Sequence, residues 1–416
     1  MPAMACPMRK AAAANAEGAG QHVPARSAGR RRSGRRRPGQ RAEPPPVRGY
    51  RLETEPPNGA ASGLPTVRDT SGPPCTVCSR MPPMTAKTEA PLILAVDVGG
   101  TTLAAGAVTP AGDVLLEERV PTARDGRGQA VESILWMMGK VRDAAERLGH
   151  PITAVGVGVP GPVDTVTGRI GEHVPHVPEL SGRPLARQLT ERFGVPAYVD
   201  NDVNALALAE WTFGTARGAR SLVVLAAGTG FGAGIILDGR LVRGASGFGG
   251  EFGHTPVKFD GPRCWCGGRG CLAVYASGRG IAEAAQARVA GHPDAALLRA
   301  ADGDPLAIRA PLVFRVAAEG DPTAAMIVDE ACQALGAMIG TVVNGLNPEV
   351  VVVTGGVATS LAPLETRILK AAGEYAFPRA LATTRVTIVP GDKRLTMRGA
   401  AALVLYETGG RPEESR

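Results

Sequence analysis

The sequence predicts an α/β protein of two lobes with a cleft between them, preceded by a long basic arm. Three observations support this prediction. From residue 91 onward, short β-branched runs alternate with amphipathic helical stretches. The strand runs form two clusters, each with its own glycine turn, and the first 90 residues differ in composition from the rest. A chain of 416 residues with 44% hydrophobic content has ample material for packed cores.

The first 90 residues have the composition of a disordered segment. They hold 15 Lys and Arg against 6 Asp and Glu, a net charge of +9, whereas the remaining 31 basic and 33 acidic residues give −2. They also hold 14 of the 35 prolines and the run RSAGRRRSGRRRPGQR, without apolar periodicity. Such an arm could attract nucleic acid through charge, but it lacks features that give specificity, so we do not expect that partner. Alternatively, translation starts at Met81 or Met84, and the arm is a mis-assigned extension.

No targeting or membrane segment is expected. The N-terminal basic residues are not followed by an apolar run of a signal peptide. The longest apolar stretch, 221–237, is broken by four glycines and is short for a bilayer span. We therefore predict a cytoplasmic protein with no membrane partner. In that reducing compartment, clustered cysteines favour metal binding over disulfides.

The expected elements follow from period-2 and period-3.6 patterns. Eight strands are predicted at 92–98, 103–109, 154–160, 197–202, 221–227, 232–239, 349–355 and 385–391. Four helices are predicted at 129–148, 203–213, 322–346 and 397–406.

The first glycine turn lies between two apolar strands, in Asp97-Val98-Gly99-Gly100-Thr101-Thr102. Glycines without side chains let backbone N–H groups approach an anion, and the threonine hydroxyls can add donors. Asp97 at the strand end could hold Mg²⁺ through water. The stretch is a candidate phosphate-binding hairpin.

Two more glycine turns end apolar strands. Gly228-Thr229-Gly230 again turns one strand into the next, and Gly355-Gly356 follows VVVVT, where it could lie flat against a nucleotide. Taken singly, each such turn is most often a plain tight hairpin. Three of them at strand ends favour a nucleotide-binding cleft.

A strand ends on Asp200-Asn201-Asp202, and a helix is expected to begin at once. In α/β sheets, ligands bind at this end of the strands. Two interpretations stay open. Asn201 or Asp202 caps the helix, or Asp202 accepts a proton from an alcohol that Asn201 positions.

Four possible metal ligands follow one another with the spacing H-x9-C-x-C-x4-C. They are His254, Cys264, Cys266 and Cys271. Three thiolates and one imidazole complete a tetrahedral zinc site, and a closed site is structural. Glycines within CWCGGRGC supply the tight turns. Glu251, three residues before His254, would be held beside a metal ligand, either to orient it or to face a substrate.

Eight motifs follow one another from about residue 92 to the C-terminus. They are LAVDVGGTT, GVGVPGPVD, VDNDVNA, AAGTGFGAG, GASGFGGEFGH, CWCGGRGC, NPEVVVVTGGV and RGAAALV. In this order they resemble the ROK family (repressor, open reading frame, sugar kinase) of the actin-like, hexokinase-like superfamily. The resemblance implies two actin-like (ribonuclease H-like) lobes. The smaller would comprise 91–207 plus 397–416, and the larger 208–396 with the zinc site. A homodimer or homotetramer is also implied.

The resemblance further implies roles for individual residues. Asp202 would be the base on the 6-hydroxyl of a hexose, and His254 would serve both zinc and sugar. The sugar-binding residues would be Asn201, Glu251, His254 and Gly161. Both lobes would hold ATP phosphates, with Mg²⁺ near Asp97, through Gly99, Gly100, Thr101, Thr102, Gly228, Thr229, Gly230, Gly355 and Gly356.

One position departs from the family pattern. The usual motif C-x-C-G-x-x-G-C-x-E ends in a glutamate that reaches the sugar, whereas this chain has Ala273 there. The predicted function is an ATP-dependent hexokinase, most simply a glucokinase. The alternatives are a kinase for an N-acetylhexosamine or another hexose, and a sugar-responsive transcriptional regulator of the same family.

Overall fold

This computed structural model describes residues 90–409, apart from 101, 123–129, 173 and 175–176. The predicted disordered arm and Thr101 therefore lie outside the described residues. By the contacts between their Cα atoms, the described residues belong to one compact unit. Everything below concerns that unit.

The first sheet has five strands in the order β3-β2-β1-β4-β7. The strand β1 pairs antiparallel with β2, which pairs antiparallel with β3, whereas β4 and β7 run parallel to β1. The strands are β1 (Leu92–Val98), β2 (Thr102–Val108), β3 (Val114–Pro121), β4 (Ile152–Val159) and β7 (Ala197–Asn201).

Alternate residues of β1 serve two cores. Leu92, Leu94 and Val96 pack with residues of the helices α1 (Ala130–Arg147) and α2 (Leu185–Phe193). Ile93 and Ala95 on the other face pack with the C-terminal helix α12 (Lys393–Glu407). Because successive strand residues point to opposite faces, a strand that is apolar throughout its first five residues requires cover on both sides, and the two helix layers provide it.

The second sheet repeats the first. Its order is β10-β9-β8-β11-β12, again with an antiparallel hairpin followed by two parallel strands. The strands are β8 (Leu222–Ala227), β9 (Phe231–Leu237), β10 (Arg240–Leu241), β11 (Val350–Thr354) and β12 (Arg385–Ile388). Two five-stranded mixed sheets with one strand order confirm the predicted two-lobed α/β fold.

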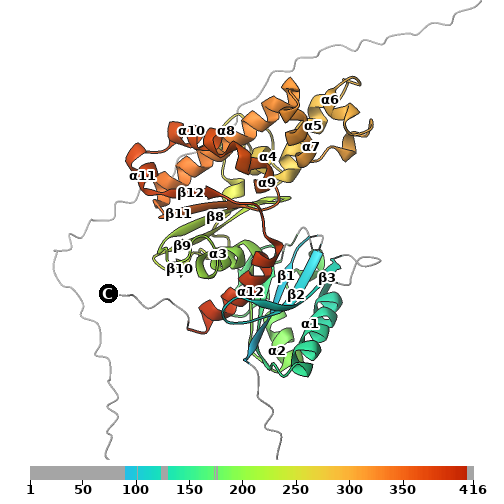
Figure 1. The fold of residues 1–416 in the computed structure, drawn as a ribbon, viewed down its shortest axis with the longest axis vertical. Helices are drawn as coiled ribbons and strands as arrows, with labels where there is room; N and C mark the ends of the chain where they lie inside the picture. The colour runs from blue at the N-terminus through green and yellow to red at the C-terminus, as the bar shows by residue number, and fades with distance from the viewer. Residues whose placement is uncertain (1–89, 101, 123–129, 173, 175–176, 410–416) are drawn as a thin grey trace, which may run out of the picture. The chain divides into compact units, whose positions relative to one another are not determined.

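The helices α3 (Asp202–Thr212) and α12 lie between the two sheets (Figure 1). Both contribute to a core with Leu222 and Val224 of β8. The predicted lobe boundaries at 207–208 and 396–397 fall inside these two helices, so the division into lobes stays a prediction. Helix α12 begins at Lys393, four residues earlier than predicted.

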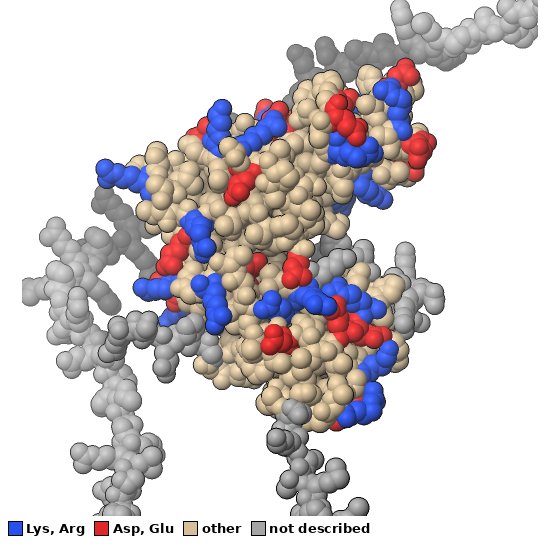
Figure 2. Space-filling view, in the orientation of Figure 1, with Lys and Arg blue, Asp and Glu red and all other residues tan. Residues whose placement is uncertain are grey.

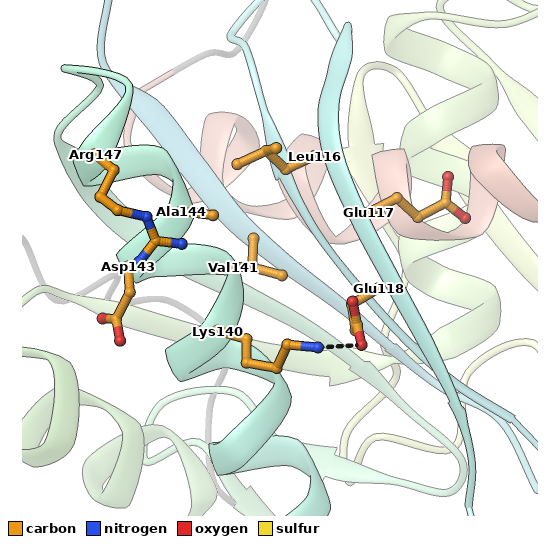
Figure 3. A pocket seen from close by; sticks show the side chains of 8 residues that line it. All are labelled: Leu116, Glu117, Glu118, Lys140, Val141, Asp143, Ala144 and Arg147. Carbon is orange, nitrogen blue, oxygen red and sulfur yellow. Dashed lines mark hydrogen bonds and ion pairs between the residues drawn. The ribbon is translucent and has the colours of Figure 1, made fainter.

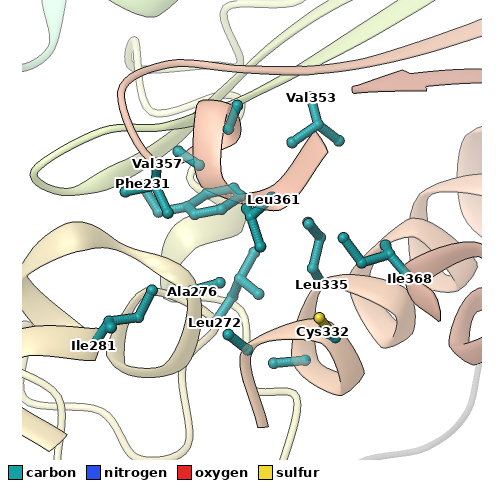
Figure 4. Close-up of a cluster of buried hydrophobic side chains, with 14 of the residues drawn as sticks. Phe231, Leu272, Ala276, Ile281, Cys332, Leu335, Val353, Val357, Leu361 and Ile368 are labelled. Carbon is teal, nitrogen blue, oxygen red and sulfur yellow. The ribbon is translucent and has the colours of Figure 1, made fainter. Parts of the chain in front are cut away.

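The other face of the second sheet carries a helical layer. Val353 of β11 packs with Leu272, Cys332, Leu335 and further residues of this layer (Figure 4). Its helices are α4 (Ala273–Ala276), α5 (Gly278–Val289), α6 (Ala296–Arg299), α7 (Ala310–Ala318), α8 (Pro322–Leu346), α9 (Ala358–Leu361), α10 (Glu365–Tyr375) and α11 (Pro378–Thr383). The remaining short elements are β5 (Val163–Asp164), β6 (Arg169–Ile170) and 3₁₀ turns at Pro178–Leu180, Phe252–His254, Pro305–Ala307 and Ala362–Leu364.

By length and composition alone, α8 could cross a membrane. However, 67% of its most apolar window is buried inside the protein. Its buried face includes Ile327, Leu335 and Ile339, which belong to the large core of the helical layer. The hydropathy of α8 is therefore that of a central packing helix.

Candidate functional site

Asn201 at the end of β7 is the N-cap of α3. Its Oδ1 accepts hydrogen bonds from the backbone N–H groups of Val203 (2.9 Å) and Asn204 (3.3 Å). Its Nδ2 donates to the Gly161 carbonyl at 3.2 Å. The capping interpretation therefore holds for Asn201, and the same side chain brings Gly161 to the strand end. Gly161 has φ +93°, a conformation that favours glycine.

Asp202 is the first residue of α3, and its environment favours the neutral acid. Burial is the largest effect and raises the pKa of Asp202 to about 7, with the negative charge of Asp97 next. A hydrogen bond from the Val203 N–H opposes this shift, and the charge of Glu251 adds to it. A carboxylate that titrates near neutral pH can accept a proton from an alcohol and release it again.

Asp97 lies on β1 and faces the same region, since its charge acts on Asp202. Burial raises the pKa of Asp97, although a hydrogen bond from Thr396 and the charge of Arg119 oppose the shift. Thr396 lies on α12, and its Oγ1 donates a hydrogen bond to the Asp97 Oδ2 at 2.7 Å. The fold thus brings three carboxylates from separate segments, those of Asp97, Asp202 and Glu251, within electrostatic reach of one another.

The first glycine turn is a tight hairpin between β1 and β2. The Gly99 N–H donates to the Thr102 carbonyl at 3.0 Å, and the Gly99 carbonyl accepts from Thr122 Oγ1 at 2.6 Å. A Cβ at Gly99 would lie 2.9 Å from the Thr102 oxygen. Gly100 and Thr102 are exposed. The turn therefore requires glycine at Gly99 and presents its tip to solvent, beside Asp97.

The second and third glycine turns lie together. Their strands β8 and β11 are parallel neighbours in the second sheet. The Gly228 N–H donates to the Gly230 carbonyl at 3.0 Å, and Gly278 and Arg279 at the start of α5 donate to the Gly228 and Thr229 carbonyls at 2.9 and 3.0 Å. A Cβ at Gly355, whose φ is +107°, would lie 2.5 Å from the Ala227 oxygen.

A glycine-lined backbone surface results at the ends of these two strands. A Cβ at Gly278 would lie 3.2 Å from the Gly228 oxygen and 3.4 Å from Val357 Cγ2. Gly356 has open space at the position of its missing Cβ. Such a surface lets the backbone approach a flat or anionic ligand closely.

The four predicted metal ligands converge. His254 Nδ1 and the Sγ atoms of Cys264, Cys266 and Cys271 all lie within 4.8 Å of one another. The Cys266 and Cys271 sulfurs are 3.8 Å apart, and Cys264 Sγ is 3.6 Å from His254 Nδ1. Tetrahedral zinc with ordinary bond lengths requires about 3.8 Å between sulfurs and about 3.6 Å between sulfur and nitrogen. The donor set and its spacing therefore fit zinc.

The loop around the ligands depends on glycine. Gly267 and Gly270 have φ +92° and +66°. A Cβ at Gly268 would lie 3.3 Å from two of the sulfurs, and one at Gly270 would lie 1.7 Å from the Lys258 carbonyl oxygen. Because His254 turns Nδ1 toward the sulfurs, its Nε2 lies on the far side of the ring.

Ala273 lies two residues beyond the last cysteine, at the start of α4. It is 1% exposed and belongs to the core of the helical layer, with Leu272 and Phe231. Its carbonyl accepts a hydrogen bond from Ser277 Oγ at 2.6 Å. The position at which the family motif has a sugar-binding glutamate is therefore a buried methyl group here.

Two surface hollows in the described region lie away from these residues. One, of about 260 Å³, lies between β3 and α1, where Lys140 pairs with Glu118 at 2.6 Å (Figure 3). The other, of about 490 Å³, lies between Lys258, Tyr275 and one face of α8. Neither includes a predicted site residue.

The contacts of Asp97 and Gly99 involve residues that the sequence patterns did not single out. Thr122 and Thr396 donate to them from a loop and from α12. Asp200 forms an ion pair with Arg243 at 2.7 Å, a contact that the sequence pattern of the strand end does not indicate. No local pattern distinguishes these partners, because each pair joins segments that are distant in sequence.

Comparison with known proteins gives one consistent result. A sequence profile described as the ROK family matches residues 93–407. The glucokinase of Thermotoga maritima is 31% identical over 323 residues, covering 76% of this chain and 98% of the relative. The N-acetyl-D-glucosamine kinase of Escherichia fergusonii is 31% identical over 321 residues, covering 75% and 98%.

Two solved structures are also similar. One is a ROK family glucokinase from Streptomyces griseus in complex with glucose and AMPPNP, with 31% identity, a TM-score of 0.63, and coverage of 74% of this chain and 98% of the other. The second is a ROK family transcriptional regulator, a homolog of the E. coli MLC protein, with 26% identity, a TM-score of 0.68, and coverage of 77% and 80%.

Proposed function

Since the chain belongs to the ROK family, we propose that it is an ATP-dependent kinase that phosphorylates a hexose at its 6-hydroxyl, with glucose as the first candidate substrate. The observation that carries this proposal is the carboxyl group of Asp202. It stands at the start of α3, and burial raises its pKa to about 7. Around it lie Asn201, Asp97 and Glu251, the groups that a sugar and a metal-bound phosphate would require.

The proposed reaction asks little covalent chemistry of the protein. Phosphoryl transfer depends on alignment of the acceptor and on stabilisation of charge. Asp202 accepts the proton of the sugar hydroxyl as the phosphoryl group arrives, and Asn201, fixed as the helix cap, orients that hydroxyl. Mg²⁺, when bound with ATP, neutralises phosphate charge, and Asp97 would hold it through water.

The glycine turns supply the proposed ATP-binding surface. The Gly99 and Gly100 turn follows Asp97 on β1, and the Gly228–Gly230 and Gly355–Gly356 turns meet at the ends of β8 and β11. Their exposed backbone can approach phosphates and the nucleoside without interference from side chains. The Streptomyces griseus relative was solved with AMPPNP, which supports ATP as the donor.

The metal site would form one wall of the sugar pocket. With His254 Nδ1 turned toward the sulfurs, Nε2 is available to a sugar hydroxyl, and zinc would fix the orientation of the ring. Glu251 precedes the 3₁₀ turn that contains His254 and is exposed. We propose that both side chains contact sugar hydroxyls.

Ala273 decides which hexose fits best. Loss of a charged hydrogen-bond partner for one sugar hydroxyl should weaken binding by about 1.5–3 kcal/mol, or roughly ten- to a hundredfold. An N-acetylhexosamine is the second candidate, because the Escherichia fergusonii relative is an N-acetyl-D-glucosamine kinase.

A sugar-responsive regulator is the alternative from a different class, and the similarity to the regulator structure favours it. A regulator has no need of a proton acceptor or of phosphate turns, whereas this chain has Asp202 and three such turns. Figure 2 shows acidic and basic side chains interspersed over one face of the described residues, without a continuous basic patch on that face. The kinase remains the better account.

An ATP-coupled screen over a panel of hexoses tests the proposal. We expect turnover with glucose or N-acetylglucosamine and none with 6-deoxyglucose, which lacks the acceptor hydroxyl. Binding of sugar without turnover of any hexose would favour the regulator. Light scattering on the same sample tests the proposed dimer or tetramer. We also propose a cytoplasmic location, where ATP is available to the protein.

A further inference from the structure

We propose that Arg243 is a positioning residue of the phosphoryl-transfer site. Its ion pair with Asp200 holds the strand end that carries Asn201 and Asp202 at a fixed distance from the loop that carries Glu251 and His254. This inference rests on the proposed function, because it concerns the same sugar site. Neither Arg243 nor Asp200 needs to touch the sugar for the inference to hold.

Asp200 organises the strand end. It is 2% exposed. Its Oδ1 accepts hydrogen bonds from the Asn201 N–H at 2.7 Å and from Asn204 Nδ2 at 3.0 Å. Its Oδ2 accepts from Arg243 Nε at 2.7 Å. One buried carboxylate thus fixes the residue before Asp202 and a side chain of the first turn of α3.

Arg243 organises the loop on the other side. Its carbonyl accepts a hydrogen bond from the Gly249 N–H at 2.8 Å, which closes the loop on itself. The next residue, Gly250, has φ +93°, and its carbonyl accepts from Ala233 of β9 at 3.0 Å. Glu251 follows directly. The backbone of Arg243 therefore holds the base of the Glu251 loop while its side chain reaches Asp200.

A third segment anchors the guanidinium. Glu407, near the end of α12, forms a second ion pair with Arg243, and the Tyr406 ring lies 5.7 Å from the guanidinium carbon. Burial alone would lower the pKa of Arg243, but the charges of Asp200 and Glu407 raise it above the usual value. The arginine stays charged, and its two carboxylate partners fix its position.

This arrangement suits a positioning role because the two site segments belong to different sheets. Asp202 follows β7 of the first sheet, and the Glu251 loop follows β10 of the second. A planar guanidinium that binds carboxylates sets both distance and angle between its partners. A change of about 1 Å between a base and its acceptor can reduce the rate about a hundredfold.

The test compares four variants of the full chain in steady-state assays with the best hexose. In Arg243→Met and Asp200→Asn, we expect kcat/KM for the sugar to fall by at least about tenfold, with KM for ATP changed by less than about twofold. Arg243→Lys keeps the charge and should recover part of the loss. The matched control, Arg220→Met, breaks an exposed ion pair with Asp238 at 3.0 Å and should keep the parental sugar KM.

The double variant Asp200→Asn with Arg243→Met should be no worse than Arg243→Met alone, because both changes break one pair. It also avoids the unpaired buried carboxylate that could unfold the single variant. A KM for ATP that rises as much as the KM for the sugar, or parental sugar kinetics in folded Arg243→Met and in the double variant, would overturn the inference. A wild-type protein that phosphorylates no hexose would instead overturn the proposed function, and this inference with it.

Discussion

Replacing Asp202 by asparagine should stabilise the protein at alkaline pH while it removes the proposed base. In the folded protein, burial raises the pKa of Asp202 from the ordinary value of 3.8 to about 7, so the carboxyl group keeps its proton until about pH 7. The unfolded chain releases this proton near the ordinary value. Between these two pKa values the folded state binds more protons, so its stability falls as pH rises. Asparagine does not titrate, and its Oδ1 can still accept the Val203 N–H.

The magnitude follows from the shift. About three pKa units at about 1.4 kcal/mol each would give about 4 kcal/mol. Because the Asp202 side chain keeps partial contact with solvent, screening reduces this, and we expect a gain on the order of 2 kcal/mol at pH 8. The gain should shrink steadily toward pH 5, where the wild-type carboxyl is protonated in the folded state.

Urea unfolding of both proteins at pH 5, 6, 7 and 8 measures the difference directly. The free energy of unfolding of the variant should exceed that of the wild type increasingly with pH. A difference that does not change with pH, or a variant that is less stable at pH 8, would refute the argument that burial and the charges of Asp97 and Glu251 shift this carboxyl group.

Three further predictions concern activity and the metal. The wild-type kcat/KM for the sugar should fall about tenfold per pH unit below about pH 7, since protonated Asp202 cannot act as base; a flat profile from pH 5.5 to 8 would contradict this. Metal analysis of the purified protein should find about one zinc per chain. The variant Cys271→Ala should lose this zinc, whereas Cys332→Ala, at a buried cysteine outside the cluster, should keep it. Ala273→Glu should lower the KM for glucose by about ten- to a hundredfold; because Ala273 is buried in an apolar core, urea unfolding must first show that the variant is folded, and no gain in a folded variant would indicate a pocket reshaped for another sugar.

The sequence was sufficient to predict elements that are strongly periodic. All eight expected strands and all four expected helices are present, with ends displaced by a few residues. The strand β3 was missed because it lies at a sheet edge, where Glu117, Glu118 and Arg119 break the apolar alternation. The helix α5, GRGIAEAAQARV, was missed because a stretch rich in alanine and glycine lacks a clear apolar stripe.

The metal cluster was predictable because its four ligands lie within one short segment, so spacing alone constrains them. The contacts that surround Asp202 were not. Asp97, Thr396 and Arg243 approach the strand end from β1, from α12 and from the loop after β10. Their relation depends on how the two sheets pack around α3 and α12, and no local pattern contains that information. We expect the sugar specificity to depend on the same packing and on Ala273.

The central claim is that Asp202 accepts the proton of a hexose 6-hydroxyl during phosphoryl transfer. The most direct measurement is the rate of phosphoryl transfer from ATP to the best hexose by the wild type and by Asp202→Asn, with NMR identification of the product. The account predicts a 6-phosphate from the wild type and a rate lower by about 10²–10⁴-fold in a variant that still binds the sugar. A variant as active as the wild type, or a product phosphorylated at another hydroxyl, would contradict it.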